Sequence, residues 1–213
     1  MDDSVTQVWT IGHSNHPYDR FRDLLREAGI TAVADVRTAP FSRYSPHFNS
    51  DELCCSLRRD GVAYIFLGKQ LGGRPASRGL YRNEVADYEA IAATNEFREG
   101  LDRVVDGAHR YRVALMCSEQ NPLDCHRCLL IGRALAQRGV QVSHLLADGR
   151  TMSHSEVQQE LLRLTGRDEE DLLMSPDERL ATAYREHARK VAFQEQSVDL
   201  QESVAAIAND GSV

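Results

Sequence analysis

The 213-residue chain lacks features typical of membrane proteins and of secreted disulfide frameworks. Its apolar runs fall well short of the roughly 20 residues that a membrane-spanning helix needs. The first residues, Met1 to Val5, lack the basic and apolar pattern of a signal peptide. Five cysteines are an odd number and do not suggest paired disulfides. We therefore expect a cytoplasmic protein without a membrane partner, in which the cysteines pack, bind metal or react.

Positive charge is also scarce, since 25 Lys and Arg stand against 32 Asp and Glu and give a net charge of −7. This balance argues against a protein that coats duplex DNA by charge alone. The segment from Arg37 to Arg82 is the exception, with eight basic and three acidic residues. An acidic chain with one basic segment indicates an anionic small-molecule or nucleotide-like ligand, and nucleic acid is a further candidate partner.

Apolar runs that alternate with helical patterns predict an α/β fold. Five runs are typical of buried strands, and they cover residues 5–11, 32–36, 63–67, 113–116 and 141–146. Helical patterns separate them, including residues 50–60 and a helix from Cys125 toward Arg138 with Asp124 as its N-cap. Strands separated by helices imply right-handed crossovers. We therefore predict a Rossmann-like parallel sheet of about five strands with helices on both faces, plus C-terminal helices.

The length suits one substantial domain with an extension. We expect a Rossmann-like α/β domain at 1–150, a C-terminal helical extension packed on it at 151–193, and a flexible tail at 194–213. Capping-box patterns that begin at Ser153 and Ser175 predict helices at about 155–164 and 176–193 in the extension.

Polar residues cluster where three of the predicted strands end. They are His13, Ser14, Asp35, Arg37, Cys117 and Glu119. Because the carboxyl ends of parallel strands share one edge of a sheet, where ligands bind, we expect these side chains around one cleft. The stretch 68–81 is rich in Gly, Arg, Ser and Pro and is typical of a long loop. Such a loop usually covers or builds a site, so we expect Arg74 or Lys69 to lean over this edge.

Reactive residue types are concentrated between Cys117 and Cys128. Cys125, His126 and Arg127 stand at the predicted helix start, where exposed N–H groups favour anions and lower the pKa of a thiol. A cationic Arg127 is unfavourable there unless it meets an anion. Free cysteines often act as small apolar residues, so we interpret Cys128, and Cys54 with Cys55 in the helix at 50–60, as packing residues.

Several short blocks occur in an order that resembles a known family. They are Thr10-Ile-Gly-His13-Ser14, Asp35-Val-Arg37 with Pro40, Leu71-Gly72-Gly73, and Met116-Cys117-x-Glu119 followed by Cys125-His126-Arg127. Over about residues 10–144 the chain is similar to the bacterial and archaeal domain-of-unknown-function family 488. The resemblance implies a Rossmann-like α/β domain with these blocks as its signature, and it supplies no reaction.

Three functions fit these residues, and the first is an enzyme, a hydrolase or transferase, for a phosphate-bearing small molecule, nucleotide or nucleic-acid end. The catalytic candidates are Cys117, Glu119, Cys125, His126, His13 and Asp35, and the ligand-binding candidates are Arg127, Arg37, Ser14 and Arg74. In one mechanism a thiol is the nucleophile, as in cysteine phosphatases and sulfurtransferases. In the other, Glu119 or Asp35 acts as nucleophile or base, and His13 acts as general acid or base.

The second function is a metal or redox-sensing module in which Cys117, Cys125, His126 and Cys128 hold zinc or an iron–sulfur cluster. No second Cys-x-x-Cys pair completes a structural site, so the spacing speaks against it, and we assign no metal ligand. The sequence does not identify a cofactor. The third function is a non-catalytic domain that binds a nucleotide or nucleic acid through residues 37–82. That segment has few aromatic side chains for stacking on bases.

Overall fold

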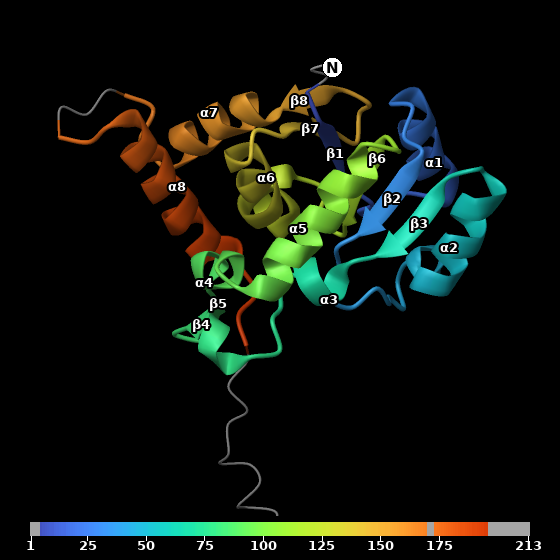
Figure 1. Ribbon diagram of the computed structural model, residues 1–213, viewed down its shortest axis with the longest axis horizontal. Coiled ribbons are helices and arrows are strands. Elements are labelled where there is room, and N and C mark those ends of the chain that lie inside the picture. Colours follow the sequence, from blue (N-terminus) through green and yellow to red (C-terminus); the bar gives the residue numbers. More distant parts are fainter. Residues whose placement is uncertain (1–4, 170–172, 196–213) are drawn as a thin grey trace, which may run out of the picture.

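Six strands form the central sheet of the computed structural model, which describes residues 5–169 and 173–195 (Figure 1). They are β1 (Gln7–Gly12), β2 (Ala32–Asp35), β3 (Ala63–Phe66), β6 (Val113–Cys117), β7 (Gln141–Leu145) and β8 (Thr151–Ser153). Their order is β3-β2-β6-β1-β7-β8, and all neighbours pair in parallel except β7 and β8. The predicted parallel sheet is confirmed, with β8 as an additional antiparallel edge strand.

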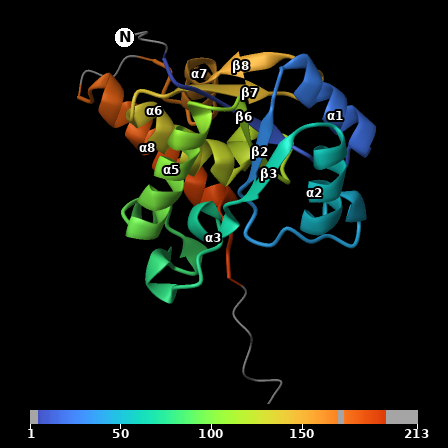
Figure 2. The same cartoon turned by 45° about the vertical axis from the view of Figure 1, so that its right-hand side comes forward.

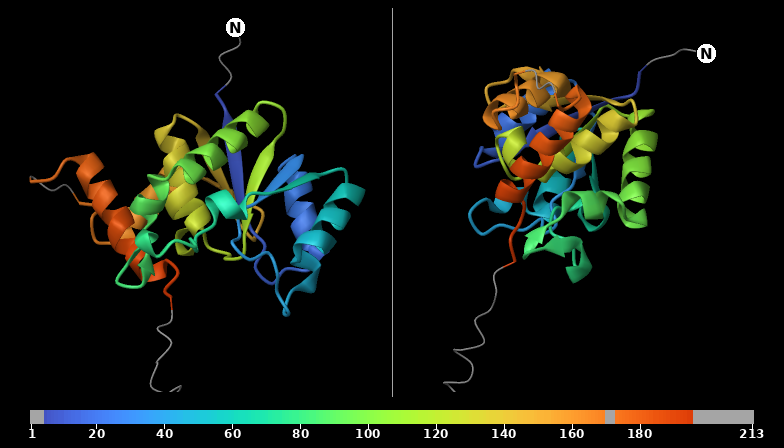
Figure 3. Two further views of the ribbon diagram at one scale, coloured as in Figure 1. Left: turned by 60° about the horizontal axis from the view of Figure 1, so that its bottom comes forward. Right: turned by 90° about the vertical axis from the view of Figure 1, so that its left-hand side faces the viewer.

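Helices cover both faces of the sheet, as the sequence predicts (Figure 3). They are α1 (Tyr18–Glu27), α2 (Ser50–Arg59), α3 (Gly68–Leu71), α4 (Tyr88–Ala92), α5 (Asn95–Ala108), α6 (Arg133–Gln137), α7 (His154–Leu164) and α8 (Pro176–Val191). Successive strand residues point to opposite faces. Ile11 and Val33 therefore pack with α1 and α2, whereas Val8 and Leu115 pack with α5, α6 and α7.

The C-terminal helices α7 and α8 begin with complete capping boxes, at Ser153 and Ser175. Both predicted helices are therefore confirmed. After α8 the backbone runs beside β5 (Val85–Ala86), the partner of β4 (Tyr81–Arg82) in a small ribbon, where Ala86 N donates to Phe193 O. The predicted flexible tail covers residues 194–213, and its part after residue 195 lies outside the described residues. The predicted domain boundary at residue 150 stays a prediction. No helix in the described residues is both long and apolar enough to cross a membrane.

The stretch 68–81 is not the uninterrupted loop that its composition predicts. It contains α3 and a 3₁₀ turn, η2 (Arg78–Leu80). Leu71 of α3 is fully buried against α5, where an added Cβ on Gly100 would lie 2.8 Å from the Leu71 side chain (Figure 2). Tertiary packing therefore produces a helical turn in a segment whose local sequence favours a loop.

The helix after β6 begins later than predicted. Pro122–Asp124 forms a 3₁₀ turn, η3, and Cys125 is extended with φ −139° and ψ 138°. A π-helical segment, η4 (Arg127–Gly132), then continues into α6. The prediction that Asp124 caps this helix is therefore wrong. Such wide turns inside helices often occur at functional sites.

Cys54 and Cys55 are also placed differently from the prediction. Cys54 is half-buried and Cys55 is exposed, because Leu53 and Leu57 form the inner face of α2. Cys128 is fully buried, as predicted.

Candidate functional site

The strands β1, β2 and β6 end together at one edge of the sheet. Gly12 pairs with Cys117, and Asp35 pairs with Met116. The backbone bonds continue beyond the strands, since His13 N donates to Cys117 O and Ser14 N donates to Ser118 O, both at 2.9 Å. The polar blocks that follow these strands therefore lie next to one another.

Four side chains converge just beyond β6. The ligand-type atoms of Cys117, Glu119, Cys125 and His126 all lie within 4.8 Å of one another. Both thiols donate to Glu119 Oε2, at 2.9 Å from Cys117 Sγ and 3.0 Å from Cys125 Sγ. His126 Nδ1 lies 3.6 Å from Cys117 Sγ and 3.8 Å from Cys125 Sγ. We call these four residues the edge cluster.

The His126 ring is held in one orientation. Its Nε2 lies 2.9 Å from Val36 O, and because a carbonyl can only accept, Nε2 carries a proton and Nδ1 faces the thiols. The ring also packs on Gly73, where an added Cβ would lie 2.8 Å from His126 Cγ. Val36 and Gly73 are contributors that the sequence analysis missed. Gly73 belongs to the Leu71-Gly72-Gly73 block, and the presence of that block in the family signature is the sequence signal that could have indicated its role.

Arg127 is fully buried and fixes the loop that carries Glu119. Its NH1 donates to Glu119 O at 2.6 Å and its NH2 to Gln120 O at 2.9 Å. An added Cβ on Gly12 would overlap Glu119 O, so glycine is required for this close approach. The sequence predicts that Arg127 binds an anion, but both of its terminal nitrogens donate hydrogen bonds to backbone carbonyls.

Asp35, Arg37 and His13 form a buried chain beside the edge cluster. Arg37 donates to both Asp35 oxygens, at 2.9 and 2.6 Å, and Tyr64 donates to Asp35 Oδ2 at 2.9 Å. Arg37 NH1 lies 3.1 Å from His13 Nε2. Burial, and then the Arg37 charge, lower the pKa of His13 to about 4. His13 is therefore neutral at pH 7, and its Nε2 accepts a hydrogen bond from Arg37 NH1. Asp35 forms an ion pair with Arg37.

A cleft of about 500 Å³ opens above the edge cluster. Among the residues that line it are Arg37, Arg74, Cys117, Glu119 and His126, with the rings of Phe41, Tyr88 and Phe193. Arg74 is exposed, and its guanidinium lies 4.5 Å from the centroid of the Phe193 ring. Five of the predicted site residues do not line the cleft, namely His13, Ser14, Asp35, Cys125 and Arg127. Ser14 is half-buried, with φ 49° and its hydroxyl on Asn15.

The two thiols of the edge cluster differ in acidity. The hydrogen bond with Cys125, followed by burial, raises the pKa of Cys117 well above its usual value. Burial opposes ionisation of Cys125, but interaction with the neighbouring Cys117 thiol and the Arg127 charge lower its pKa. Burial and the neighbouring Cys125 raise the pKa of Glu119. Burial opposes protonation of His126, but the hydrogen bond with Cys125 outweighs it and raises the pKa of His126.

Cys128 does not join the edge cluster, so the predicted metal set that included it is wrong. Its side chain turns inward from η4, and its Sγ lies 4.0 Å from His144 Nε2. Together with His154 these residues form a second group, whose ligand-type atoms also lie within 4.8 Å of one another. Neither histidine was predicted from the sequence, although a histidine within the apolar run of β7 is a visible signal.

Fold and site together define an α/β protein with a two-cysteine, one-histidine, one-glutamate cluster at the carboxyl edge of a mostly parallel sheet. The chain belongs to the family described as "Domain of unknown function DUF488", whose family model matches residues 17–134. This range includes the edge cluster, the Asp35–Arg37 pair and Gly73, and confirms the resemblance seen in the sequence. Comparisons with curated proteins and with solved structures give no match.

Proposed function

We propose that this protein is a zinc-dependent hydrolase for a phosphate-bearing substrate, with the ion held by Cys117, Cys125 and His126. The convergence of two thiols and an imidazole carries the proposal. In a tetrahedral site with Zn–S of about 2.3 Å and Zn–N of about 2.0 Å, sulfur and nitrogen ligands lie roughly 3.5 Å apart. The distances of 3.6 and 3.8 Å from His126 Nδ1 to the two sulfurs match this spacing.

The surroundings of His126 also suit a metal ligand. Metal-binding histidines usually donate their second ring N–H to a carbonyl or carboxylate, which fixes the ring and its tautomer. Val36 O accepts that hydrogen bond here. The free Nδ1 lone pair therefore faces the point on which both thiols converge.

Glu119 stands at the side of the edge cluster that faces the cleft. Its carboxylate is close enough to both sulfurs to supply a fourth ligand. With zinc held by the two thiols and His126, the same carboxylate would be placed to accept a proton from an attacking water. A zinc ion at this point supplies Lewis acidity for hydrolysis.

The cleft itself favours an anionic substrate. Arg37 and Arg74 both line it, and Arg74 is exposed with no ion pair among the described contacts. Cationic clefts attract phosphate groups and raise their local concentration. Arg37 contributes less, because Asp35 neutralises it.

A thiol nucleophile fits this geometry less well. Cys117 and Cys125 are 3% and 2% exposed, and both sulfurs are directed at Glu119 and His126. The guanidinium of Arg127, which could have cradled an attacked phosphate, is bound to backbone carbonyls. The site therefore resembles a set of ligands more than an anion cradle.

Elemental analysis of the purified full chain tests the zinc proposal. We expect the Cys117→Ser/Cys125→Ser variant to lose one equivalent of zinc relative to wild type, whereas Cys55→Ser, at an exposed position of α2, retains it. Equal zinc content in all three proteins contradicts the proposal.

The hydrolase proposal is tested with 4-nitrophenyl phosphate and bis(4-nitrophenyl) phosphate as probes. We expect Glu119→Gln to keep zinc and to lose roughly 10²–10⁴-fold in rate, the usual contribution of a general base. A zinc-bound wild type that hydrolyses neither ester would make the protein a metal-containing binding domain.

A further inference from the structure

Beyond the edge cluster, the core contains a second convergence of ligand-type side chains. Cys128 comes from η4, His144 from β7 and His154 from the first residue of α7. Cys128 Sγ lies 4.0 Å from His144 Nε2, which lies 3.0 Å from His154 Nδ1. The three residues are 0%, 0% and 5% exposed. We propose that they form a second metal site, which takes a thiophilic ion of the Zn²⁺ or Cu⁺ class.

Both imidazole rings are oriented from behind by hydroxyl groups. Thr10 Oγ1 lies 2.8 Å from His144 Nδ1, and the Tyr184 hydroxyl lies 3.0 Å from His154 Nε2. Such outer hydrogen bonds are what usually fix the rings of metal-binding histidines. They leave His144 Nε2 and His154 Nδ1 facing each other, with the Cys128 sulfur beside them.

The spacing requires little rearrangement around an ion. With about 2.0 Å to each nitrogen and 2.3 Å to sulfur, ligand atoms lie roughly 3.3 to 3.5 Å apart. The nitrogens are slightly closer than this and the sulfur slightly farther, so shifts of roughly half an ångström suffice. The alternative, a proton shared by the two histidines, leaves the thiol with a contact at the outer limit of a hydrogen bond. An ion engages all three groups.

The local backbone is shaped to admit these side chains. The π-helical turn carries Cys128 inward, and its last residue, Gly132, lies against the His154 ring. An added Cβ on Gly132 would lie 3.2 Å from His154 Cε1 and 3.2 Å from Arg127 O. The wide turn and the missing side chain therefore make room for an imidazole beside the sulfur.

The ligand set selects the class of ion. Cysteine and histidine suit Zn²⁺ and Cu⁺, whereas Mg²⁺ and Ca²⁺ require oxygen ligands. No carboxylate of the described residues belongs to this group. The ligands tie η4, β7 and α7 together in the core, so the ion stabilises the attachment of α7 to the sheet.

A full-length variant in which Cys128 is the sole cysteine tests this site in isolation. It carries Cys54→Ser, Cys55→Ser, Cys117→Ser and Cys125→Ser. It is reduced, loaded separately with Zn²⁺, Co²⁺ and anaerobic Cu⁺, and desalted. We expect about one equivalent of Zn²⁺ or Cu⁺, and a thiolate-to-cobalt charge-transfer band in the near ultraviolet. That band can come only from Cys128. The two loading arms distinguish Zn²⁺ from Cu⁺, and a native fold without bound metal overturns the proposal.

Matched variants identify the histidine ligands. Adding His154→Gln to the sole-cysteine variant should abolish the cobalt band, whereas adding His109→Gln, in the turn after α5, should leave it unchanged. Near-ultraviolet circular dichroism confirms the fold of each protein. If a variant without Cys128 unfolds, the charge-transfer band of the sole-cysteine protein still decides the question.

The proposals for the edge cluster and for the core site can be tested independently of each other. Metal that survives Cys117→Ser/Cys125→Ser and disappears with Cys128→Ser supports the core site alone. Metal that is lost completely in Cys117→Ser/Cys125→Ser supports the edge cluster alone and overturns the core site.

Discussion

At the scale of single residues, glycines control how closely the loops approach the edge cluster. Gly12 leaves space for the carbonyl of Glu119, and Gly73 leaves space for the ring of His126. Neither glycine has a positive φ in the structure, so their role is close approach and not backbone conformation. The sequence motifs that contain them therefore support the site without donating a functional group.

Gly73→Ala should weaken zinc binding at the edge cluster. The new Cβ would lie 2.8 Å from His126 Cγ, so the ring must shift away from the thiols. Disturbing such an outer contact typically costs 10–100-fold in metal affinity. Competition against a chromophoric chelator measures the change. Gly79→Ala is the matched control, because its Cβ meets no atom closer than 3.7 Å, and equal affinities for the two variants would show that His126 tolerates the shift.

The buried residues at this scale also explain why the number of basic residues in the sequence does not give the number of cations available to a ligand. Arg37 and Arg127 are cations in the predicted site, yet each is 4% exposed or less. Asp35 and Phe48 O engage Arg37, and the Glu119 and Gln120 carbonyls engage Arg127. A buried guanidinium needs partners, and the chain supplies them to Arg37 and to both terminal nitrogens of Arg127, whereas Arg127 Nε has none among the described residues. Arg74, by contrast, is an exposed cation that lines the cleft.

At the scale of elements, the caps of α7 and α8 agree with local sequence rules. Each capping box satisfies two N–H groups that would otherwise lack an intrahelical partner. The start of η4 does not follow such rules, since Cys125 Sγ accepts the Arg127 N–H at 3.4 Å in place of the expected Asp124. A side chain of the edge cluster thus also contributes to the helix start.

Ser175→Ala should lower the free energy of unfolding by about 1 kcal/mol, the usual cost of losing a serine N-cap. Ser175 accepts the Glu178 N–H, and the Glu178 carboxylate accepts the Ser175 N–H in return. Urea denaturation measures the loss. Ser175→Asp, which keeps a capping oxygen, should recover most of it, and zinc content should stay constant in both variants. Equal destabilisation by Ala and Asp would mean that the hydroxyl acts in some other way.

At the scale of the whole molecule, the sheet brings distant segments to one cleft, and the exposed Arg74 lines it. Phosphate should raise the melting temperature of wild type, because a ligand bound to the native state stabilises it by mass action. Arg74→Ala should reduce this shift substantially.

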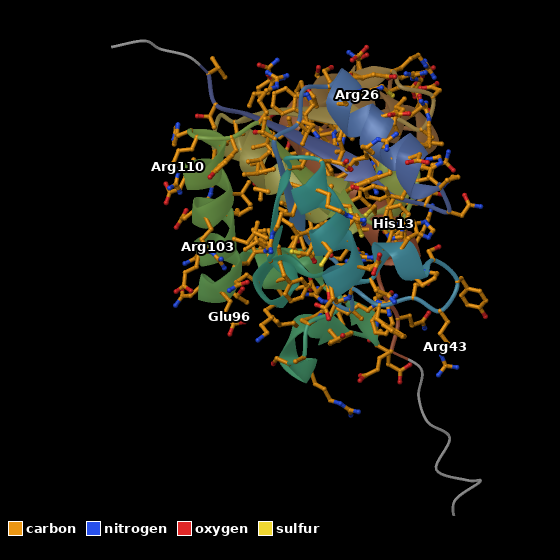
Figure 4. The ribbon with its side chains drawn as sticks, turned by 90° about the vertical axis from the view of Figure 1, so that its right-hand side faces the viewer. His13, Arg26, Arg43, Glu96, Arg103 and Arg110 are labelled. Atoms are coloured by element: carbon orange, nitrogen blue, oxygen red, sulfur yellow. The ribbon has the colours of Figure 1, made fainter. Side chains whose placement is uncertain are left out.

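Arg103→Ala is the control for the phosphate experiment. Arg103 is exposed on α5, far from His13 in Figure 4, and does not line this cleft. Chloride at equal ionic strength corrects for screening, and sulfate corrects for the general stabilisation that such anions give. If phosphate shifts both variants equally, Arg74 does not bind the anion.

The sequence by itself determined the elements and their class. Five strands followed from apolar runs, the caps at Ser153 and Ser175 from their spacing, and the shared edge from the parallel arrangement. The predicted burial is wrong for β3, because β3 lies at the edge of the sheet and Ile65 is 41% exposed. These signals are local, because hydrogen-bond periodicity and capping involve residues a few positions apart. The position of Cys117 at a strand end could therefore be predicted.

Only the tertiary structure decided which of these residues meet. β6 enters the sheet between β1 and β2, which brings Val36 O to His126, 90 positions later. The π-helical turn separates Cys128 from Cys125 and directs it toward His144. Strand order, register and an i→i+5 turn depend on packing between segments far apart in the chain, and residue periodicity carries no record of them.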